Sequence, residues 1–331
     1  MIPHALLVGV SLLFHPLTDT TATAPVDSAL PSVAPLGRDT TAPHVDSSAI
    51  VPLPSVHESI REREAEDYRP GPVDFITNLP GDWVDWTTEN VTVENVPIIA
   101  GITAATVALV LIDEEGYHVL RDPYLRSPDF QKASDMAVFI GDGKFQFGIA
   151  CLFGAYGFIA DDARAIRTAS QTAEVILACG GVVQVLKHLT GRESPFVATS
   201  PTGRWALFPD QIAYHNHVPH YDAFPSGHVA TGLATLTVIM ENYPEATWLP
   251  WVGYPAIGAL AVGMVGAGIH WWSDYPLAIA LGYTFGKLVG SRRSDDRQGA
   301  GRTSIAPDRA PYLGLSMLSD GSPAVGIAWS W

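Results

Sequence analysis

Three short segments of this chain contain residue types that can transfer a phosphoryl group. In the segment PSGH, Ser226 is placed to cap a helix that starts at Gly227 or His228. The free backbone N–H groups of such a helix start favour a bound anion. An imidazole beside that anion is suited to act as a general acid. The alternative is an ordinary capped helix with an incidental histidine.

The second segment contains His270 and Asp274, which are four residues apart. If the helix predicted before them continues, they share one of its faces. An aspartate that accepts a hydrogen bond from one ring nitrogen fixes the tautomer and leaves the other nitrogen as a nucleophile. It also stabilises the positive charge that forms when the ring attacks phosphorus. The alternative is a His–Asp pair on a helix surface that takes no part in chemistry.

The third segment contains two cations, Lys187 and Arg192, on either side of Gly191. Gly191 is the predicted C-terminal cap of a helix. Two cations within six residues at a helix end can converge on one anion. Alternatively, Lys187 complements the negative end of the helix dipole.

Together, the three segments resemble the type 2 phosphatidic acid phosphatase superfamily. This superfamily includes lipid phosphatases, bacterial nonspecific acid phosphatases and vanadium haloperoxidases. Its pattern, in chain order, has a first motif K-x6-R-P, a second motif P-S-G-H and a third motif S-R-x5-H-x3-D. The order and spacing match here, with Lys187 in the first motif, His228 in the second and His270 in the third. The resemblance covers residues 97–290 and implies an all-α helical bundle whose three motifs meet at one end.

The resemblance also implies roles for individual residues. His270 would form a phosphohistidine, His228 would protonate the leaving oxygen, and Asp274 would orient His270. No metal and no other cofactor is expected for phosphatase activity. The groups implied to hold the phosphate oxygens are Lys187 and the backbone at Ser226 and Gly227.

The chain departs from the superfamily pattern at both of its arginines. Ser194 takes the arginine position of the first motif, and Gly263 and Met264 take the Ser-Arg positions of the third. Charge-assisted hydrogen bonds of this kind contribute about 1.5–3 kcal/mol each. Losing two of them without compensation would cost about two to four powers of ten in rate. We therefore expect Arg192 to line the anion pocket with Lys187, and Ser194 is a possible further pocket residue.

The loop between the first two motifs is rich in histidine and also carries Arg204. We expect His217 or His220 to line the anion pocket as well. A His-x-His metal site is an alternative, although no cysteine lies nearby to support it. Solvent-exposed loop histidines are the third possibility.

The composition limits the class of partner. Hydrophobic residues make up 47% of the 331 residues and charged residues 16%, against about 25% charged in average soluble domains. A large core or contact with a membrane surface would account for this. The formal net charge of −15 argues against nucleic-acid binding, which needs lysine and arginine.

Cys151 and Cys179 are expected to be buried free thiols, with a disulfide as the alternative.

The chain divides by composition into segments of different character. The apolar run at residues 5–14 is too short to span a bilayer and is typical of a signal peptide, which predicts a secreted or periplasmic protein. The alternative is a disordered apolar tail. Alternating apolar residues on both sides of a turn predict a C-terminal hairpin. The expected parts are a signal peptide (1–24), a disordered linker (25–72), a phosphatase-like helical domain (73–295), a second linker (296–310) and a β-hairpin (311–331).

Apolar runs within the helical domain predict its main helices. The first runs are about 16 residues long, at the short edge for spanning a bilayer. The loops at 161–164 and 241–245 lack a positive-inside bias. We therefore favour a water-soluble core, with an integral membrane protein as the alternative. The expected helices cover residues 97–112, 145–160, 169–189, 228–240, 248–274 and 275–290.

These observations lead to one main functional hypothesis and two alternatives. The main hypothesis is a metal-independent phosphoester hydrolase that acts on a phosphorylated lipid or a small phosphoester. The first alternative is a haloperoxidase, in which vanadate would be the cofactor in the same pocket. The second is a non-catalytic protein that retains the fold. The sequence makes no prediction of the oligomeric state.

Overall fold

The computed structural model describes residues 67–292 in full and the backbone of residues 312–317 and 323–328. The predicted signal peptide (1–24), most of the first linker and the second linker (296–310) lie outside the described residues.

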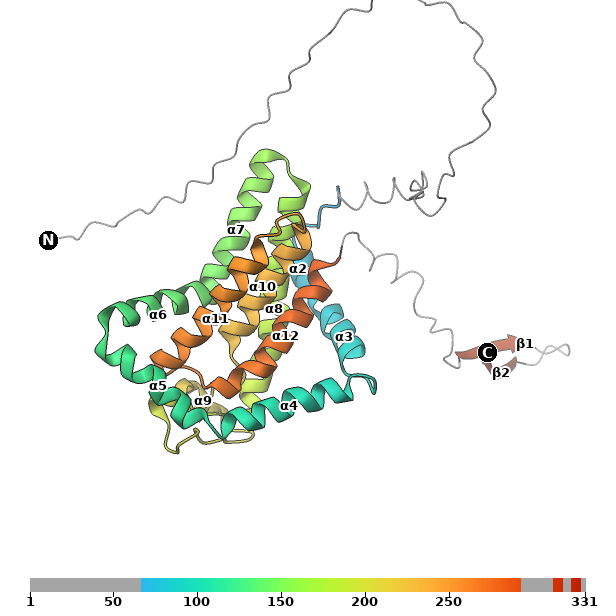
Figure 1. Cartoon of the computed structure of the whole chain (residues 1–331). Coiled ribbons are helices and arrows are strands. Elements are labelled where there is room, and N and C mark those ends of the chain that lie inside the picture. Colours follow the sequence, from blue (N-terminus) through green and yellow to red (C-terminus); the bar gives the residue numbers. More distant parts are fainter. Residues whose placement is uncertain (1–66, 293–311, 318–322, 329–331) are drawn as a thin grey trace, which may run out of the picture. The chain divides into compact units, whose positions relative to one another are not determined.

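The centre of the helical domain is formed by three helices that bury apolar side chains against one another (Figure 1). They are α8 (Ala163–Thr190), α10 (Gly227–Asn242) and α12 (Tyr275–Gly290). Glycine allows α10 and α12 to approach closely. A Cβ at Gly282 would lie 2.4 Å from the carbonyl oxygen of Ala230, and a Cβ at Gly286 would lie 2.5 Å from Cβ of Thr237. Any larger residue would push the two helices apart.

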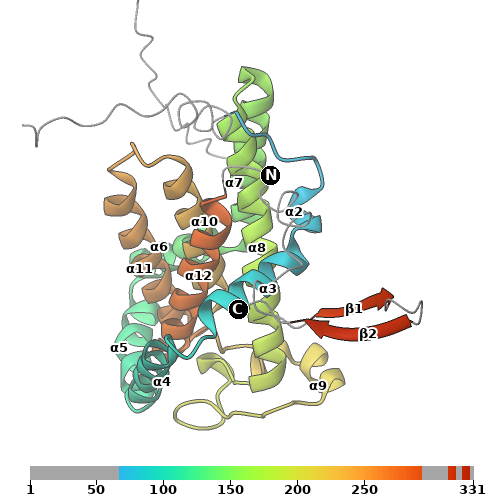
Figure 2. The ribbon, with the colours of Figure 1, turned by 90° about the vertical axis from the view of Figure 1, so that its right-hand side faces the viewer.

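The other helices surround this centre. Figure 2 shows α7 beside α8, and α11 packs against α5 and α6. The fold of the described domain is therefore all-α, as predicted. The helices that surround the centre are α2 (Asp74–Thr77), α3 (Leu79–Asn90), α4 (Val96–Val110), α5 (Asp113–Arg126), α6 (Pro128–Gly141), α7 (Gly143–Ala160), α9 (Gln211–Asn216) and α11 (Leu249–Ala267).

Polar caps set the ends of α8. The predicted end is confirmed, because Gly191 caps the helix with φ of 53°. The predicted start at residue 169 is too late. The Asp162 side chain accepts a hydrogen bond from the backbone N–H of Ala165, so the polar first turns are helical as well.

The predicted helix over residues 248–274 is wrong at its C-terminal end. α11 stops at Ala267, and Gly268 follows with φ of 82°. A Cβ at Gly268 would lie 3.0 Å from Cβ of Phe196, so both its conformation and its close packing favour glycine. His270 and Asp274 therefore lie in the connection to α12 and not on one helix face. This connection includes a short 3-10 turn, Trp272–Asp274.

The C-terminal hairpin is present as the alternating pattern predicts. Strands β1 (Tyr312–Met317) and β2 (Pro323–Ala328) are antiparallel, with Leu313 opposite Ile327 and Leu315 opposite Val325. The turn between them lies outside the described residues.

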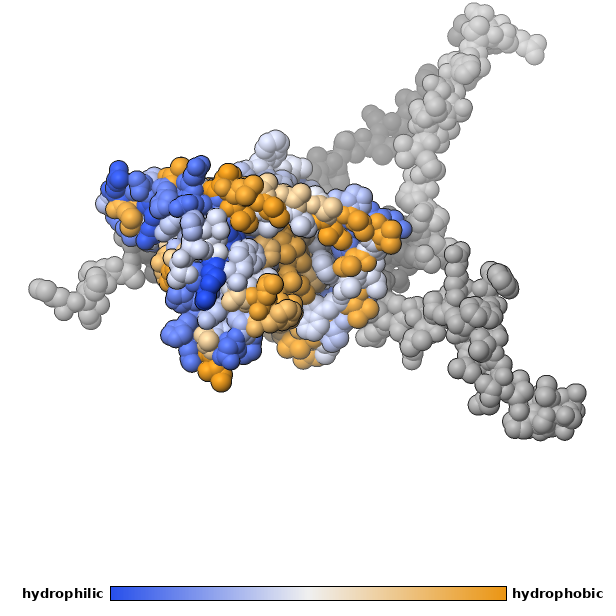
Figure 3. Space-filling view, turned by 90° about the horizontal axis from the view of Figure 1, so that it is seen from below, coloured by the Kyte–Doolittle hydropathy of each residue, from blue (hydrophilic) through white to orange (hydrophobic). Residues whose placement is uncertain are grey.

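Apolar side chains are unusually exposed on the outer helices. Phe158 and Ile159 at the end of α7 are 85% and 84% exposed, and Trp251 on α11 is 82% exposed. Figure 3 shows apolar residues gathered in patches on one face of the molecule, next to hydrophilic residues. Among the described residues, three helices, α7, α8 and α11, are long and apolar enough to cross a bilayer, and α4 and α5 pass the same test together as a bent pair. These features are compatible with membrane association.

The two cysteines differ from the prediction in one respect. Both are free, as expected, and Cys179 is buried on α8. Cys151 is exposed, because it lies on α7, and that helix buries few of its side chains. No disulfide joins them.

Candidate active site

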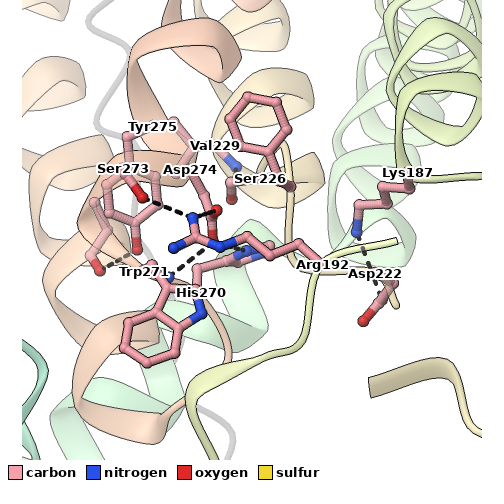
Figure 4. Close-up of polar contacts among 12 residues, drawn as sticks. Lys187, Arg192, Asp222, Ser226, Val229, His270, Trp271, Ser273, Asp274 and Tyr275 are labelled. Carbon is pink, nitrogen blue, oxygen red and sulfur yellow. Dashed lines mark hydrogen bonds and ion pairs between the residues drawn. The ribbon is translucent and has the colours of Figure 1, made fainter. Parts of the chain in front are cut away.

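The three motif segments meet where α8 ends and α10 begins (Figure 4). Gly191 turns the chain sharply, and a Cβ there would lie 2.3 Å from the carbonyl oxygen of Ala206. Arg192 then pairs through its backbone with both Trp205 and Asp222, which brings the end of the histidine-rich loop back to the site.

A backbone hydrogen bond joins the second and third motifs. The N–H of Ser226 donates to the carbonyl oxygen of Asp274 at 3.1 Å. Ser226 also caps α10 as predicted, since its Oγ accepts a hydrogen bond from the N–H of Val229 at 3.4 Å. The segment PSGH is therefore fixed at both its backbone and its capping side chain.

The two candidate catalytic histidines lie close to each other. The ring centroids of His228 and His270 are 6.4 Å apart, and their planes are inclined by 69°. His228 lies in the first turn of α10, and His270 is buried in the connection after α11. The two rings are thus close enough to contact one small group bound between them.

Asp274 holds His270 in the predicted way, although the helix expected to align them is absent. Oδ2 of Asp274 lies 3.2 Å from Nδ1 of His270 and accepts a hydrogen bond from the backbone N–H of Trp271 at 2.8 Å. A proton on Nδ1 would leave the lone pair of Nε2 free for attack on an electrophile.

His228 lies in a strongly perturbed electrostatic environment. Burial lowers the pKa of His228 to about 4, with further lowering from the charges of His270 and Lys187. His228 is on α10, which is outside the three helices able to span a bilayer. The unliganded site therefore holds a neutral His228 near pH 7. A bound anion between the rings would favour its protonated form.

Lys187 lies at the N-terminus of α10, as predicted from the motif pattern. Its Nζ would be 3.9 Å from a Cβ at Gly227. The same Nζ lies 3.5 Å from Oδ2 of Asp222. A cation and free backbone N–H groups therefore share this end of α10, which favours an anion there.

Arg192 is bound to carboxylates and is completely buried. Its Nη1 donates to Oδ1 of Asp274 at 2.5 Å and to Oγ of Ser273 at 2.6 Å. Its Nη2 donates to Oδ2 of Asp113 at 2.7 Å and to the carbonyl oxygen of Thr202 at 2.8 Å. Lys187 and Arg192 therefore engage different carboxylates and do not converge on one point, as Figure 4 shows.

The other predicted pocket residues lie among contacts of their own. Ser194 is buried, and its N–H donates to the carbonyl oxygen of Pro219 at 2.9 Å. Nδ1 of His220 is 3.6 Å from Oε1 of Glu193, and the ring of His217 is 6.3 Å from that of His220. Within residues 67–292, no group of three or more potential ligands is placed to hold a metal ion.

Three polar residues of the site were not expected from the sequence, namely Asp113, Asp222 and Ser273. Asp113 begins α5 and lies 79 residues before Arg192, so no local spacing indicates their contact. The signals available were a carboxylate that directly follows an apolar run, and polar residues adjoining the second and third motifs.

Part of the chain is similar in sequence to a known superfamily. The sequence profile of the PAP2 superfamily matches residues 169–295. No curated protein matches the chain significantly. Among solved structures, the crystal structure of the first transmembrane PAP2 type phosphatidylglycerolphosphate phosphatase from Bacillus subtilis is 15% identical, with a TM-score of 0.37. That alignment covers 67% of this chain and 97% of the other.

The matched region contains all three motif segments and every histidine, lysine and aspartate expected to act in them. It includes α10 and α12, the connection that carries His270 and most of α8. Residues 169–295 of this chain are therefore similar in sequence to the PAP2 superfamily.

Proposed function

We propose that this protein is a phosphoester hydrolase that works through a phosphohistidine on His270. The observation that carries the proposal is the pairing of His270 Nδ1 with Asp274 at 3.2 Å, with the ring centroid of His228 6.4 Å from that of His270. In the proposed reaction one imidazole acts as the nucleophile and the second gives a proton to the leaving group.

The proposed reaction has two steps. First, Nε2 of His270 attacks phosphorus, the bond from phosphorus to the leaving oxygen breaks, and protonated His228 gives its proton to that oxygen. Second, water attacks the phosphohistidine, neutral His228 takes a proton from the water, and the N–P bond breaks to release phosphate. The two steps restore both histidines to their starting states.

The phosphate oxygens would be held by Lys187 and by the free N–H groups at the start of α10, including Gly227. The proposed route uses no metal. In the free protein Lys187 is paired with Asp222, so an entering phosphate would have to compete for the ammonium group.

An apolar groove beside the histidines supports a lipid phosphoester as the substrate. The groove has a volume of about 570 Å³ and is lined by residues of α10, α11 and α12. Its lining includes Val229, which follows His228, and Tyr275, whose ring centroid lies 6.3 Å from that of His270. An acyl chain in this groove would place its phosphate near both rings.

We also propose that the protein associates with a membrane through its exposed apolar helices. The exposed side chains of α7 and α11 support this reading over a fully water-soluble core. Carbonate washing of membranes from cells expressing the full chain tests it. Release of the protein into the wash, or its recovery in the soluble fraction, would contradict an integral attachment.

The function is tested by comparing wild type with His270→Ala on phosphatidic acid, diacylglycerol pyrophosphate and p-nitrophenyl phosphate. We expect phosphate release by wild type in the presence of a chelator and none above background by the variant. A wild type no better than His270→Ala on every substrate would sink the proposal. Halide oxidation with added vanadate, measured on the same preparations, would instead support the haloperoxidase alternative.

A further inference from the structure

We propose that Arg192, held in place by Asp113, is a positioning residue that fixes Asp274 and through it the nucleophile His270. This inference rests on the proposed function and concerns how its site is built. It differs from the sequence expectation that Arg192 takes hold of the phosphate.

The contacts form a continuous chain of groups from α5 to the histidine. Asp113 accepts from Nη2 of Arg192 at 2.7 Å, and Nη1 of Arg192 donates to Oδ1 of Asp274 at 2.5 Å. The other oxygen of Asp274 lies 3.2 Å from Nδ1 of His270. One carboxylate oxygen of Asp274 therefore binds Arg192 and the other binds His270. The guanidinium fixes the rotation of the carboxylate.

Ser273 adds a second connection between the same groups. Its Oγ accepts from Nη1 of Arg192 and donates to Oδ2 of Asp113, while its backbone N–H donates to Oδ1 of Asp113 at 3.1 Å. Asp113 is therefore bound both to the guanidinium and to the segment that carries the catalytic aspartate. All four side chains, Asp113, Arg192, Ser273 and Asp274, are fully buried.

The donors of Arg192 leave little capacity for phosphate. The four N–H bonds of its two terminal nitrogens are all used within the protein. Nε of Arg192 is buried and has no hydrogen-bond partner among the described residues. A two-pronged grip on phosphate would break at least one of these four hydrogen bonds inside the protein, which is unfavourable.

The charges also favour a supporting role. Two aspartates and one arginine give the cluster a net charge of −1 when all three are ionised. The Asp274 carboxylate of the cluster lies 3.2 Å from Nδ1 of His270, the ring nitrogen that does not attack phosphorus in the proposed reaction. It would stabilise the positive ring that forms when Nε2 attacks. A cluster with net negative charge is poorly suited to holding a phosphate itself.

The test uses two conservative variants of the full chain, Asp113→Asn and Arg192→Lys. If Arg192 positions Asp274, both variants lower kcat for p-nitrophenyl phosphate by about 10- to 100-fold. KM and the inhibition constant of inorganic phosphate stay within about twofold in both, because neither residue touches phosphate. Matched controls are Asp122→Asn and Arg164→Lys, which alter surface ion pairs away from the site.

Other results would overturn the proposal. A rise in KM and in the phosphate inhibition constant with Arg192→Lys, but not with Asp113→Asn, would make Arg192 a phosphate ligand. Unchanged kcat in both folded variants would make the cluster merely structural. If either variant fails to fold, Ser273→Ala provides a milder change, because it removes one connection and leaves both charges. We then expect a smaller fall in kcat at constant KM, and an unchanged kcat would reject the proposal.

A measurement independent of activity separates this inference from the proposed function. In 15N-histidine spectra of the full chain, we expect the His270 resonances to report a proton on Nδ1 in wild type. That tautomer should be less populated in Asp113→Asn and in Arg192→Lys. An inactive wild type with this spectral change would reject the hydrolase function and keep the positioning role. An active wild type with identical spectra in all three proteins would support the hydrolase function and reject the positioning role.

Discussion

Two arginines of this protein are each bound by two carboxylates: the side chain of Arg192 is fully buried, and that of Arg292 is 11% exposed. Arg192 is bound by Asp113 and Asp274, and Arg292 is bound by Asp82 at 2.8 Å and Glu174 at 2.5 Å. Each arginine therefore joins two carboxylates from separate elements. Glu174 and Lys187 are both on α8, 13 residues apart, or about 20 Å along the helix.

The two clusters differ in what their carboxylates contact next. Asp274 also meets the ring of His270, whereas Glu174 also accepts a hydrogen bond from the side-chain amide of Asn78 at 3.1 Å. The Arg292 cluster thus ties α3 and α8 to the end of α12. The comparison teaches that an arginine between two carboxylates is a general way to hold elements together, and that it gains a role in chemistry where one carboxylate adjoins a reactive group.

The largest difference in kcat between the two clusters is expected when Asp274 in one and Glu174 in the other are made neutral. Asp274→Asn should lower kcat by about two to four powers of ten, because an amide N–H facing Nδ1 favours the wrong tautomer of His270. Glu174→Gln should leave kcat per folded molecule unchanged. The measurement is phosphate release, normalised to the folded fraction found by thermal unfolding. Equal losses in the two variants would remove the distinction between the clusters.

Removing the arginine of the second cluster should affect stability and not rate. Arg292→Ala leaves two buried carboxylates without their cation, which is expected to cost about 3–5 kcal/mol of unfolding free energy. For a domain of this size the Tm should fall by roughly 10 °C. Thermal unfolding of the full chain tests this, with Lys287→Ala, from a half-exposed pair, as the control. An unchanged Tm would show that the cluster contributes nothing to stability.

Sequence spacing found the groups of the site that are close together in the chain. The predicted contact of His270 with Asp274 is present although the helix expected to create it is not, because four residues of any compact turn can bring two side chains together. The cap at Gly191 was also predictable, since a left-handed residue after an apolar run is commonly glycine.

The contacts of Arg192 could not be predicted in the same way. Asp113 lies 79 residues earlier and belongs to α5, a helix that carries too little apolar periodicity to be predicted. Packing of α5 against α11 sets where Asp113 lies, and no local pattern reports such packing. Whether Arg192 faces phosphate or carboxylates therefore depended on the fold as a whole.

His228 should make the stability of the fold sensitive to acid. The pKa of His228 is lowered to about 4 in the folded protein, against about 6.5 in the unfolded chain. The unfolded state then binds the extra proton between these values, so stability is full above about pH 6.5 and is lost as the pH falls towards 4. By pH 5 the loss is about 2 kcal/mol.

His228→Asn should remove this part of the acid sensitivity. Unfolding of wild type and variant at pH 7.5 and pH 5 measures it, and the expected difference between the two proteins is the wild type's additional loss of about 2 kcal/mol. Parallel losses in both proteins would show that His228 titrates normally. The acid sensitivity would then arise elsewhere, for instance among the carboxylates.

The smallest effect is expected at the partly exposed pair of Lys187 and Asp222. Their charged atoms are 3.5 Å apart, and the Asp222 side chain is 29% exposed, so the pair contributes at most about 1 kcal/mol. Asp222→Asn should free the ammonium for phosphate and lower the inhibition constant of inorganic phosphate by about two- to fivefold. Asp161→Asn, which breaks an exposed pair with Arg69, is the control. A higher inhibition constant in Asp222→Asn would mean that Asp222 holds Lys187 in its binding position, as Asp113 is proposed to hold Arg192.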